Sequence, residues 1–424
     1  MNFGEFVARQ HRAGSLVVQP RMGFADPQVM RAGLVATKKA AATTVGTITL
    51  DSYTRVNDLV SVAQALREGI GLNGYPIVNH DETTTRAMLD GVVGPDFPVQ
   101  VRHGAARPAE IFRALVRAGI PATEGGPVSY CLPYSRAPLD ESVRNWEHCC
   151  ELLLAGGTDN GTPHLETFGG CMLGQLCPPS QLVALSVLEA LFFYRLGLRS
   201  ISVSYAQQTN MAQDQEAVAA LRKLCARLLP EAQWHVVIYA YMGVYPRTHD
   251  GALNLLAKAA ELAVTTDSER LIVKTVAEAH RIPTVAENVE ALEHAGAVAN
   301  VSSRGVADVG DSEVYAEAYA IVDAVLNCDS DLGRAMVVAF KRGLMDVPYC
   351  LHPDNAGRAR SFIGTDGRLG WSDIGSLPLR GITESRRAET ITSASLMSAL
   401  SYVQNACDVE ALEKPMNVIE GKSG

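Results

Sequence analysis

Residues 200–273 read SISVSYAQQTNMAQDQEAVAALRKLCARLLPEAQWHVVIYAYMGVYPRTHDGALNLLAKAAELAVTTDSERLIV. Three short runs in this stretch, at 200–204, 235–240 and 270–273, are rich in β-branched and apolar residues, which is typical of buried strands. The segments 213–229 and 252–262 between them have the length of helices. Strands that alternate with helices of about 10–18 residues predict βαβ units and a parallel sheet.

The same alternation extends toward the N-terminus. Further strand-like runs lie at 16–19, 45–50, 76–78 and 99–101, and helix-like segments lie at 108–118, 142–154, 179–196 and 285–294. Polar residues follow nearly every strand-like run. This pattern is typical of a barrel, in which the carboxyl ends of all strands surround the ligand site, whereas a doubly wound sheet binds its ligand mainly at one switch point. We therefore predict a TIM (β/α)8 barrel over residues 1–300.

The alternation stops in the segment 301–311, which is rich in glycine, serine and aspartate. A helix pair is expected at about 313–344, and a last helical piece is expected near 389–405. Between them lies a region that contains several glycines and prolines. We predict that residues 301–424 form an appended C-terminal region of helical and irregular structure.

Composition limits the function classes. The 424 residues are 47% apolar and 20% charged, and 37 Lys+Arg against 46 Asp+Glu give a net charge of −9, so no global positive field favours nucleic acid or anionic lipid. The longest apolar stretch, 182–194, is too short for a membrane span, and we expect no signal peptide. Nine cysteines without a C-x-x-C pair indicate reduced thiols and a cytoplasmic location. Ten scattered histidines without metal-ligand spacing predict no metal site.

One glycine motif has a misleading pattern. Gly69-Ile-Gly71-Leu-Asn-Gly74 matches G-x-G-x-x-G, which binds a pyrophosphate where it joins a strand to a helix. Here it follows a helix-like segment and precedes a short strand-like run. We interpret it as a turn.

Three arginines follow separate strand-like runs: Arg21, Arg55 and Arg102, the last with His103 beside it. The carboxyl ends of barrel strands meet at one mouth, so these side chains are expected to converge. Guanidinium groups bind carboxylates bidentately, and three of them would suit a dianionic substrate or a phosphate. Any one arginine alone is better explained as a surface ion-pair partner.

Two further groups are candidates for a ligand site. Glu124 begins the segment EGGPVSYCLPY, which also holds Tyr130 and Tyr134. A glycine pair lets the backbone approach a ligand, and the acid could bind an ammonium or relay a proton, but a tight turn with a solvated glutamate and two packed rings is equally possible. Lys274 and Glu278 are four residues apart after the last strand-like run, which fits either a surface pair on a helix or a ligand role at the mouth.

A series of short motifs follows one another along the chain: QPRMG (19–23), LDSYTR (50–55), LNGYP (72–76), QVRHG (100–104), EGGPVSYCLPY (124–134), FGGCMLGQLCPPS (168–180), VSYAQQTNMAQD (203–214), YMGVYP (241–246), VKTVAEAHRIPT (273–284), MDVPY (345–349) and NAG (355–357). Taken in this order, the motifs resemble the large (epsilon) subunit of glutamate mutase, also called methylaspartate mutase. The likeness runs from about residue 14 to about 375.

The resemblance implies a TIM barrel that uses adenosylcobalamin (coenzyme B12) to interconvert L-glutamate and (2S,3S)-3-methylaspartate by a radical rearrangement. It also implies a separate small cobalamin-binding subunit that caps the barrel mouth, with a homodimer of the large chain inside a heterotetramer. The cobalamin signature D-x-H-x-x-G is absent from this sequence. We therefore expect the small subunit to supply the lower axial histidine.

The resemblance also assigns roles to single positions. It places Arg21, Arg55 and Arg102 on the substrate carboxylates and Glu124, a candidate base, on the substrate amino group. With His103, the tyrosines Tyr130 and Tyr134 complete the expected substrate site, and Lys274 and Glu278 match the pair that handles the adenosine ribose. The expected corrin- or adenosine-facing positions are Gly23, Thr49, Asn73, Pro133, Phe168, Met242 and Gly243.

Two other functions stay open at this point. One is a B12-dependent mutase of another amino acid, which the three arginines disfavour because a monoacid would leave guanidinium charge unpaired. The other is a non-catalytic paralogue that binds acidic amino acids, which has no need for the ribose pair Lys274 and Glu278. The likeness to the family is weak after about residue 376.

Overall fold

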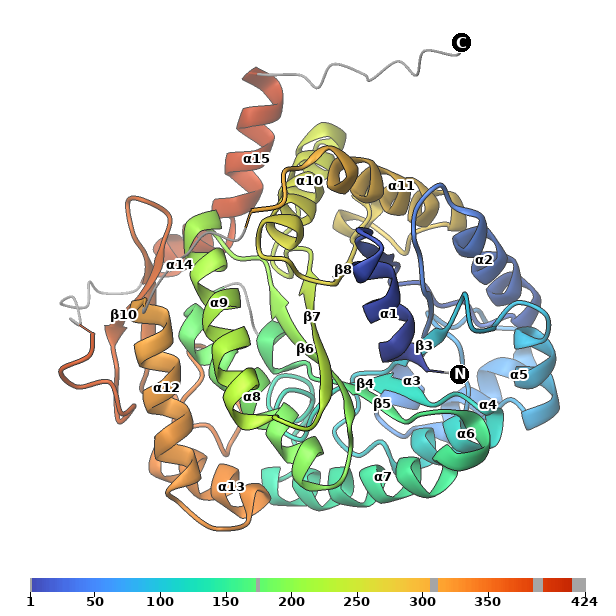
Figure 1. The fold of residues 1–424 in the computed structure, drawn as a ribbon, viewed down its shortest axis with the longest axis horizontal. Coiled ribbons are helices and arrows are strands. Elements are labelled where there is room, and N and C mark those ends of the chain that lie inside the picture. The colour runs from blue at the N-terminus through green and yellow to red at the C-terminus, as the bar shows by residue number, and fades with distance from the viewer. Residues whose placement is uncertain (1, 173–175, 306–311, 384–391, 414–424) are drawn as a thin grey trace.

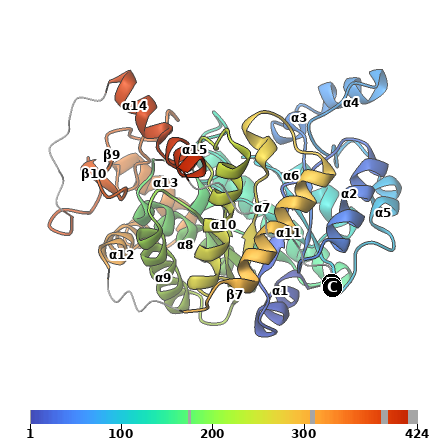
Figure 2. The ribbon, with the colours of Figure 1, turned by 90° about the horizontal axis from the view of Figure 1, so that it is seen from above.

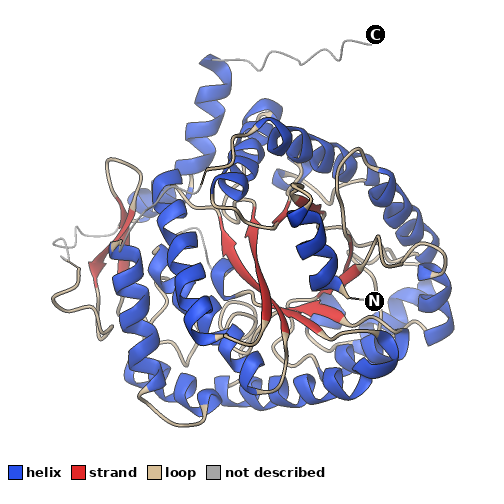
Figure 3. Ribbon diagram, viewed as in Figure 1, coloured by secondary structure: helices blue, strands red, loops and turns tan. Residues whose placement is uncertain are grey.

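The computed structural model describes residues 2–172, 176–305, 312–383 and 392–413. Eight parallel strands form one sheet in the order β1-β8-β7-β6-β5-β4-β3-β2. Figure 3 shows the barrel strands in red inside the surrounding helices. Their bounds are β1 Val17–Gln19, β2 Gly46–Thr49, β3 Val99–Arg102, β4 Ala122–Glu124, β5 His164–Glu166, β6 Ser200–Ala206, β7 Gln233–Tyr239 and β8 Arg270–Ile272. The sheet closes where β1 meets the residues just before β2: the N–H of Val18 donates a hydrogen bond to the carbonyl of Thr43 over 2.9 Å. The predicted TIM barrel is therefore confirmed.

Helices surround this barrel (Figure 1). The outer helices are α2 Pro27–Lys39, α6 Ala109–Ala118, α7 Leu139–Asn160, α8 Pro179–Arg195, α9 Met211–Leu228, α10 His249–Thr265 and α11 Val285–Val301. An excursion between β2 and β3 contains α3 Ser52–Arg55, α4 Leu59–Glu68 and α5 Glu82–Leu89, and short 3₁₀ turns occur at η1 Gly169–Cys171 and η2 Val276–Ala279. Within the described residues, none of the helices combines the length and hydrophobicity of a membrane span.

The predicted strands differ from the observed ones in three places. Strands β4 and β5 were missed because each is only three residues long, and their buried sequences, ATE and HLE, contain polar residues whose partners lie inside the barrel. The strand predicted at 76–78 is wrong. This segment is a turn, in which the carbonyl of Pro76 accepts hydrogen bonds from the N–H groups of Asn79 and His80.

Helix α1, Phe3–Arg12, closes one end of the barrel. The Phe3 ring lies 4.9 Å from the ring of His164, and the Arg270 guanidinium lies 5.0 Å from the Phe3 ring centroid. His164 and Arg270 begin their strands, so α1 covers the amino ends of the sheet. In Figure 2, α1 lies on one side of the barrel, and α3, α4, α14 and α15 lie on the opposite side, where the strands end.

The C-terminal region packs against the barrel wall. It contains α12 Glu313–Leu326, α13 Leu332–Arg342, the hairpin β9 Arg360–Ile363 and β10 Leu369–Asp373, α14 Ser393–Leu400 and α15 Tyr402–Glu413. Glu317 of α12 accepts hydrogen bonds from Ser180 (2.6 Å) and from the Trp371 indole (3.1 Å). The helix pair expected at 313–344 is observed as α12 and α13. Of the other expected segments, 306–311 and 389–391 lie outside the described residues.

Candidate active site

Glu124 is the last residue of β4 and lies at the floor of the barrel mouth, the opening formed by the carboxyl ends of the strands. Only 2% of its surface is exposed. Its Oε2 accepts hydrogen bonds from Arg102 Nε and from the Tyr239 hydroxyl, each over 2.7 Å, and its Oε1 accepts one from the Tyr130 hydroxyl. The alternative of a solvated turn glutamate is therefore wrong.

The environment of Glu124 favours its ionised form. Burial alone would raise the pKa of this carboxyl, but the Arg102 charge and the hydrogen bonds from Arg102, Tyr130 and Tyr239 hold the pKa below its ordinary value. Glu124 is therefore a carboxylate at neutral pH. It can accept a proton or bind a cation at the floor of the mouth.

A second buried carboxylate, which no sequence motif indicated, lies behind the first. The Tyr239 hydroxyl lies between Glu124 Oε2 and Glu166 Oε1, so one side chain connects the two acids. Glu166 Oε2 accepts hydrogen bonds from Arg270 and from Gln100, the latter over 3.1 Å. Two carboxylates and the guanidinium groups of Arg102 and Arg270 balance in formal charge, which a buried ionic network requires.

The three predicted arginines lie around this floor. Arg55 follows β2, and its Nε and Nη2 donate to the carbonyl of Leu50 over 3.0 and 2.7 Å. Burial lowers the pKa of Arg55, and the charges of Arg102 and Arg21 lower it further. Arg21 follows β1 and donates to Glu278 Oε2 over 2.9 Å. The fold thus brings three guanidinium groups near enough to repel one another, and an anion would relieve this repulsion.

Aromatic rings surround the floor on one side. Tyr130 is 2% exposed and packs against Phe168 at 4.9 Å between ring centroids, whereas Tyr134 is 51% exposed at the rim. His103 lies behind Tyr130, stacked on Trp146 at 5.8 Å, and burial lowers the pKa of its imidazole to about 3. His103 is therefore neutral and is held away from the exposed rim.

The glycine pair after Glu124 makes room for protein groups. Gly125 has φ +130°, and a Cβ on Gly126 would lie 2.0 Å from the carboxyl carbon of Glu189. Glu189 accepts hydrogen bonds from the N–H of Ser129 (2.9 Å) and of Gly169 (2.8 Å), so it ties the loop after β4 to the loop after β5. Burial raises the pKa of Glu189 to about 7 against the effect of these bonds. Its position inside the apolar run 182–194 was the available sequence signal.

Lys274 and Glu278 lie on the other side of the mouth, beyond β8. The Lys274 ammonium is 3.8 Å from Glu278 Oε2 and 4.8 Å from the ring centroid of Tyr245. Lys274 is 8% exposed, and burial lowers its pKa to about 8 although Glu278 opposes this. The pair is therefore not a surface pair on a helix. Glu278 joins it to Arg21, one of the three arginines.

Of the remaining predicted positions, some lie at the rim, whereas Phe168 is buried. A Cβ on Gly23 would lie 2.1 Å from the carbonyl oxygen of Thr49, so these two segments touch. Pro133 lines a pocket of about 370 Å³ with Tyr134, and Met242 and Gly243 lie partly buried in the loop after β7. Phe168 is 3% exposed between Tyr130 and Tyr239, at ring distances of 4.9 and 5.6 Å.

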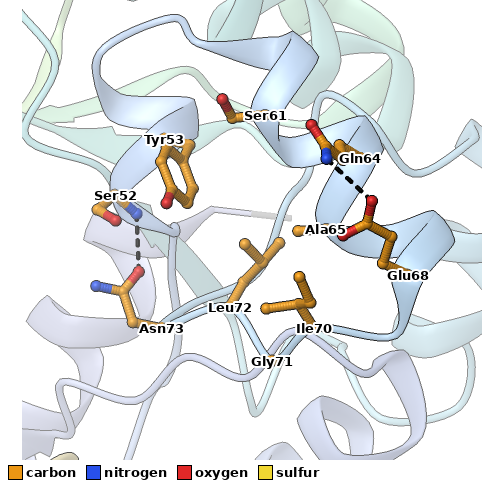
Figure 4. A pocket seen from close by; sticks show the side chains of 10 residues that line it. All are labelled: Ser52, Tyr53, Ser61, Gln64, Ala65, Glu68, Ile70, Gly71, Leu72 and Asn73. Atoms are coloured by element: carbon orange, nitrogen blue, oxygen red, sulfur yellow. Dashed lines mark hydrogen bonds between the residues drawn. The ribbon is translucent and has the colours of Figure 1, made fainter.

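Asn73 lies in the glycine-rich loop, for which the sequence predicts a turn. This loop begins at Gly69, which ends α4 in the left-handed conformation with φ +68°, and no helix follows directly. Asn73 Oδ1 accepts a hydrogen bond from the N–H of Ser52 over 2.8 Å. The loop and helices α3 and α4 enclose a pocket of about 350 Å³, and Figure 4 shows the side chains that line it.

Comparison with known proteins identifies the family. The family model described as "Methylaspartate mutase E chain (MutE)" matches residues 1–415. The glutamate mutase epsilon subunit of Halobacterium salinarum is 30% identical over 364 residues, which cover 81% of this chain and 75% of that protein. Those of Treponema denticola and Desulfitobacterium hafniense are 29% and 28% identical, over 78% and 89% of this chain and 71% and 81% of their own lengths.

Solved structures show a more distant likeness. A putative phosphonomutase from Burkholderia cenocepacia J2315 is 12% identical, with a TM-score of 0.36, and the alignment covers 63% of this chain and 91% of that chain. The family assignment does not depend on it, because the sequence match extends over nearly the whole chain. The chain belongs to the methylaspartate mutase E chain (MutE) family.

Proposed function

We propose that this chain is the large catalytic subunit of an adenosylcobalamin-dependent glutamate mutase, which interconverts L-glutamate and (2S,3S)-3-methylaspartate. The observation that carries this proposal is the ionised, buried Glu124 beside Arg102, with Arg21 and Arg55 around the same mouth. Both substrate forms carry two carboxylates and one ammonium. Three cations and one carboxylate therefore match the charges of the substrate.

In this proposal the chain binds and orients the substrate. The arginines hold the two carboxylates, Tyr130 and Tyr134 contact the substrate, and Glu124 binds the ammonium and accepts a proton at Oε1 or Oε2 as charge changes at the amino group. Because Glu124, Tyr130 and Phe168 are each at most 3% exposed, the floor excludes water from the reacting atoms. The cofactor, when bound, supplies the radical that abstracts a substrate hydrogen.

The residues at the rim fit the nucleoside part of that cofactor. A ribose has two neighbouring hydroxyl groups, and Lys274 and Glu278 offer one donor and one acceptor for them. Among the described residues, the buried Tyr245 hydroxyl, Thr49 Oγ1 and Arg21 Nε have no hydrogen-bond partner. Buried polar atoms of this kind favour a polar ligand at the rim. With Gly23, Asn73, Pro133, Met242 and Gly243, these residues would hold the cofactor from the barrel side.

The partner in this proposal is a small cobalamin-binding subunit that contributes the D-x-H-x-x-G histidine. We expect two copies of each chain in the active heterotetramer. We also place the enzyme in the cytoplasm, a location supported by nine free cysteines.

The decisive experiment is reconstitution. The purified chain alone should be colourless and inactive, and it should convert L-glutamate to 3-methylaspartate only with adenosylcobalamin and a small subunit of the same family. Corrinoid absorbance retained by this chain alone after desalting would contradict the assignment of cobalamin binding to the small subunit. Absence of conversion in the complete mixture, with folded subunits, would reject the function.

A further inference from the structure

The C-terminal helix α15 contacts the loop between β7 and α10 through an aspartate. Asp408 Oδ2 accepts a hydrogen bond from the N–H of Arg247 (3.1 Å), and Oδ1 accepts bonds from the N–H (3.0 Å) and the hydroxyl (2.6 Å) of Thr248. A Cβ on Gly251 would lie 2.8 Å from Asp408 Oδ1. One carboxylate therefore holds two successive backbone amides at the start of α10.

Two further contacts attach α15 to the same loop. Gln404, which is 7% exposed, donates from Nε2 to the carbonyl of Tyr245 over 2.7 Å. Val403 and Cys407 are buried in one apolar cluster with Tyr245 and with Tyr241, which follows β7. The loop 241–248 is thus fixed along its length by residues about 160 positions away in the chain. Figure 2 shows α15 lying across this part of the barrel.

This loop in turn contacts the cationic side of the mouth. Tyr245 is 4% exposed, and its ring faces the Lys274 ammonium at 4.8 Å, which is within the range of a cation–π contact. Lys274 pairs with Glu278, and Glu278 accepts a hydrogen bond from Arg21. A displacement of the loop would therefore move Tyr245 away from Lys274. Met242 and Gly243, two of the expected cofactor-facing positions, lie on the same loop.

We propose that α15 positions the cofactor side of the mouth, with Asp408 and Gln404 as positioning residues that act through the loop 241–248 and Tyr245. This inference rests on the proposed function, because it concerns residues expected to meet the nucleoside of adenosylcobalamin. The floor around Glu124 has different supports, namely the strand residues Arg102 and Tyr239 and the network behind them. Because Arg21 reaches the cofactor side through Glu278, loss of the α15 contacts should weaken cofactor binding more than substrate binding.

The first test needs no activity. In Asp408→Ala, amide hydrogen exchange at Arg247 and Thr248 should accelerate at least about ten-fold, because a charged hydrogen-bond acceptor is lost. Trypsin should also cleave faster after Arg247, which is exposed. Glu410→Gln is the matched control, since Glu410 lies on the same helix and pairs with Lys258 of α10 at 2.5 Å. Equal exchange and cleavage in Asp408→Ala and wild type would overturn the proposal.

The second test uses the complete enzyme with its small subunit. In Asp408→Ala and Gln404→Ala, the adenosylcobalamin concentration for half-maximal rate should rise at least about five-fold, while the KM for glutamate should stay within about two-fold. Equal increases for cofactor and substrate would indicate general loosening of the mouth and would overturn the proposal. An inactive wild-type enzyme would instead reject the proposed function, and the hydrogen-exchange result would then decide alone whether α15 holds the loop.

Discussion

Arg102 and Glu124 form a buried ion pair at the floor of the barrel mouth, with 2.7 Å between Nε and Oε2. The family resemblance assigns Arg102 to a substrate carboxylate and Glu124 to the substrate ammonium. An α-amino acid carries both groups, so it can replace both partners of this pair at once.

Glu124→Gln tests the proton-accepting role. The amide keeps the shape of the side chain but cannot take up a proton, so kcat should fall by roughly 10²- to 10⁴-fold while substrate affinity stays within a few-fold. Steady-state kinetics with saturating small subunit and cofactor measure both constants. A kcat within about three-fold of wild type would remove Glu124 from the chemistry.

Arg102→Lys and Arg55→Lys test the carboxylate site. A lysine ammonium cannot reproduce the bidentate geometry of a guanidinium, so KM should rise and kcat should fall in either variant. The decrease in kcat/KM should correspond to a loss of about 2–3 kcal/mol in transition-state stabilisation. Arg113→Lys is a suitable control, because Arg113 forms an exposed pair with Glu110 on α6. Wild-type kinetics in both mouth variants would show that these arginines do not hold the substrate.

Tyr239→Phe tests the connection between the two buried acids. The Tyr239 hydroxyl lowers the pKa of Glu124 by a hydrogen bond to the ionised form, so its removal should raise that pKa. Activity that needs ionised Glu124 is lost as pH falls through this pKa, so the acid limb of the kcat/KM profile should move to higher pH. Tyr130→Phe should shift the limb in the same direction, because its hydroxyl also lowers the pKa. An unmoved acid limb in both variants would contradict this interpretation.

The pH dependence of cofactor binding tests Lys274. Burial lowers the pKa of Lys274 to about 8, so its amine is protonated at lower pH and loses its charge as pH rises through about 8. The adenosylcobalamin concentration for half-maximal rate should therefore increase above pH 8. Lys274→Arg keeps its charge through this range and should remove the dependence. A dependence that persists in Lys274→Arg would point to another group.

Gly126→Ala tests how Glu189 ties the two mouth loops together. The added Cβ would lie 2.0 Å from the Glu189 carboxyl carbon, so the free energy of unfolding should fall by about 3 kcal/mol. Gly71→Ala is the matched control, because no heavy atom lies within 4 Å of its added Cβ. Urea denaturation of both variants gives the comparison. Equal stability of the two variants would show that Glu189 moves aside at little cost.

Part of the site could be predicted from the residues that follow the predicted strands. Arg21, Arg55 and Arg102 each follow a strand-like run, and the parallel sheet brings such ends together. Tyr239, Glu166 and Arg270 could not be found in this way, because Glu166 pairs with Tyr239 and Arg270, which lie 73 and 104 residues away in the chain. A polar residue inside a strand shows that a buried partner is needed, but the sequence does not show which residue provides it.

The sequence by itself determined the barrel, because strands and helices alternate locally and each pattern is set by neighbouring residues. It also determined the family, through the order of its motifs. Only the tertiary structure decided that Glu124 is buried and ionised, that His103 lies behind Tyr130, and that Asp408 of the last helix holds the loop after β7. These properties arise from contacts between residues distant in the chain. Burial and charge at one position depend on the closed barrel and on the helices packed against it, and no local pattern contains that information.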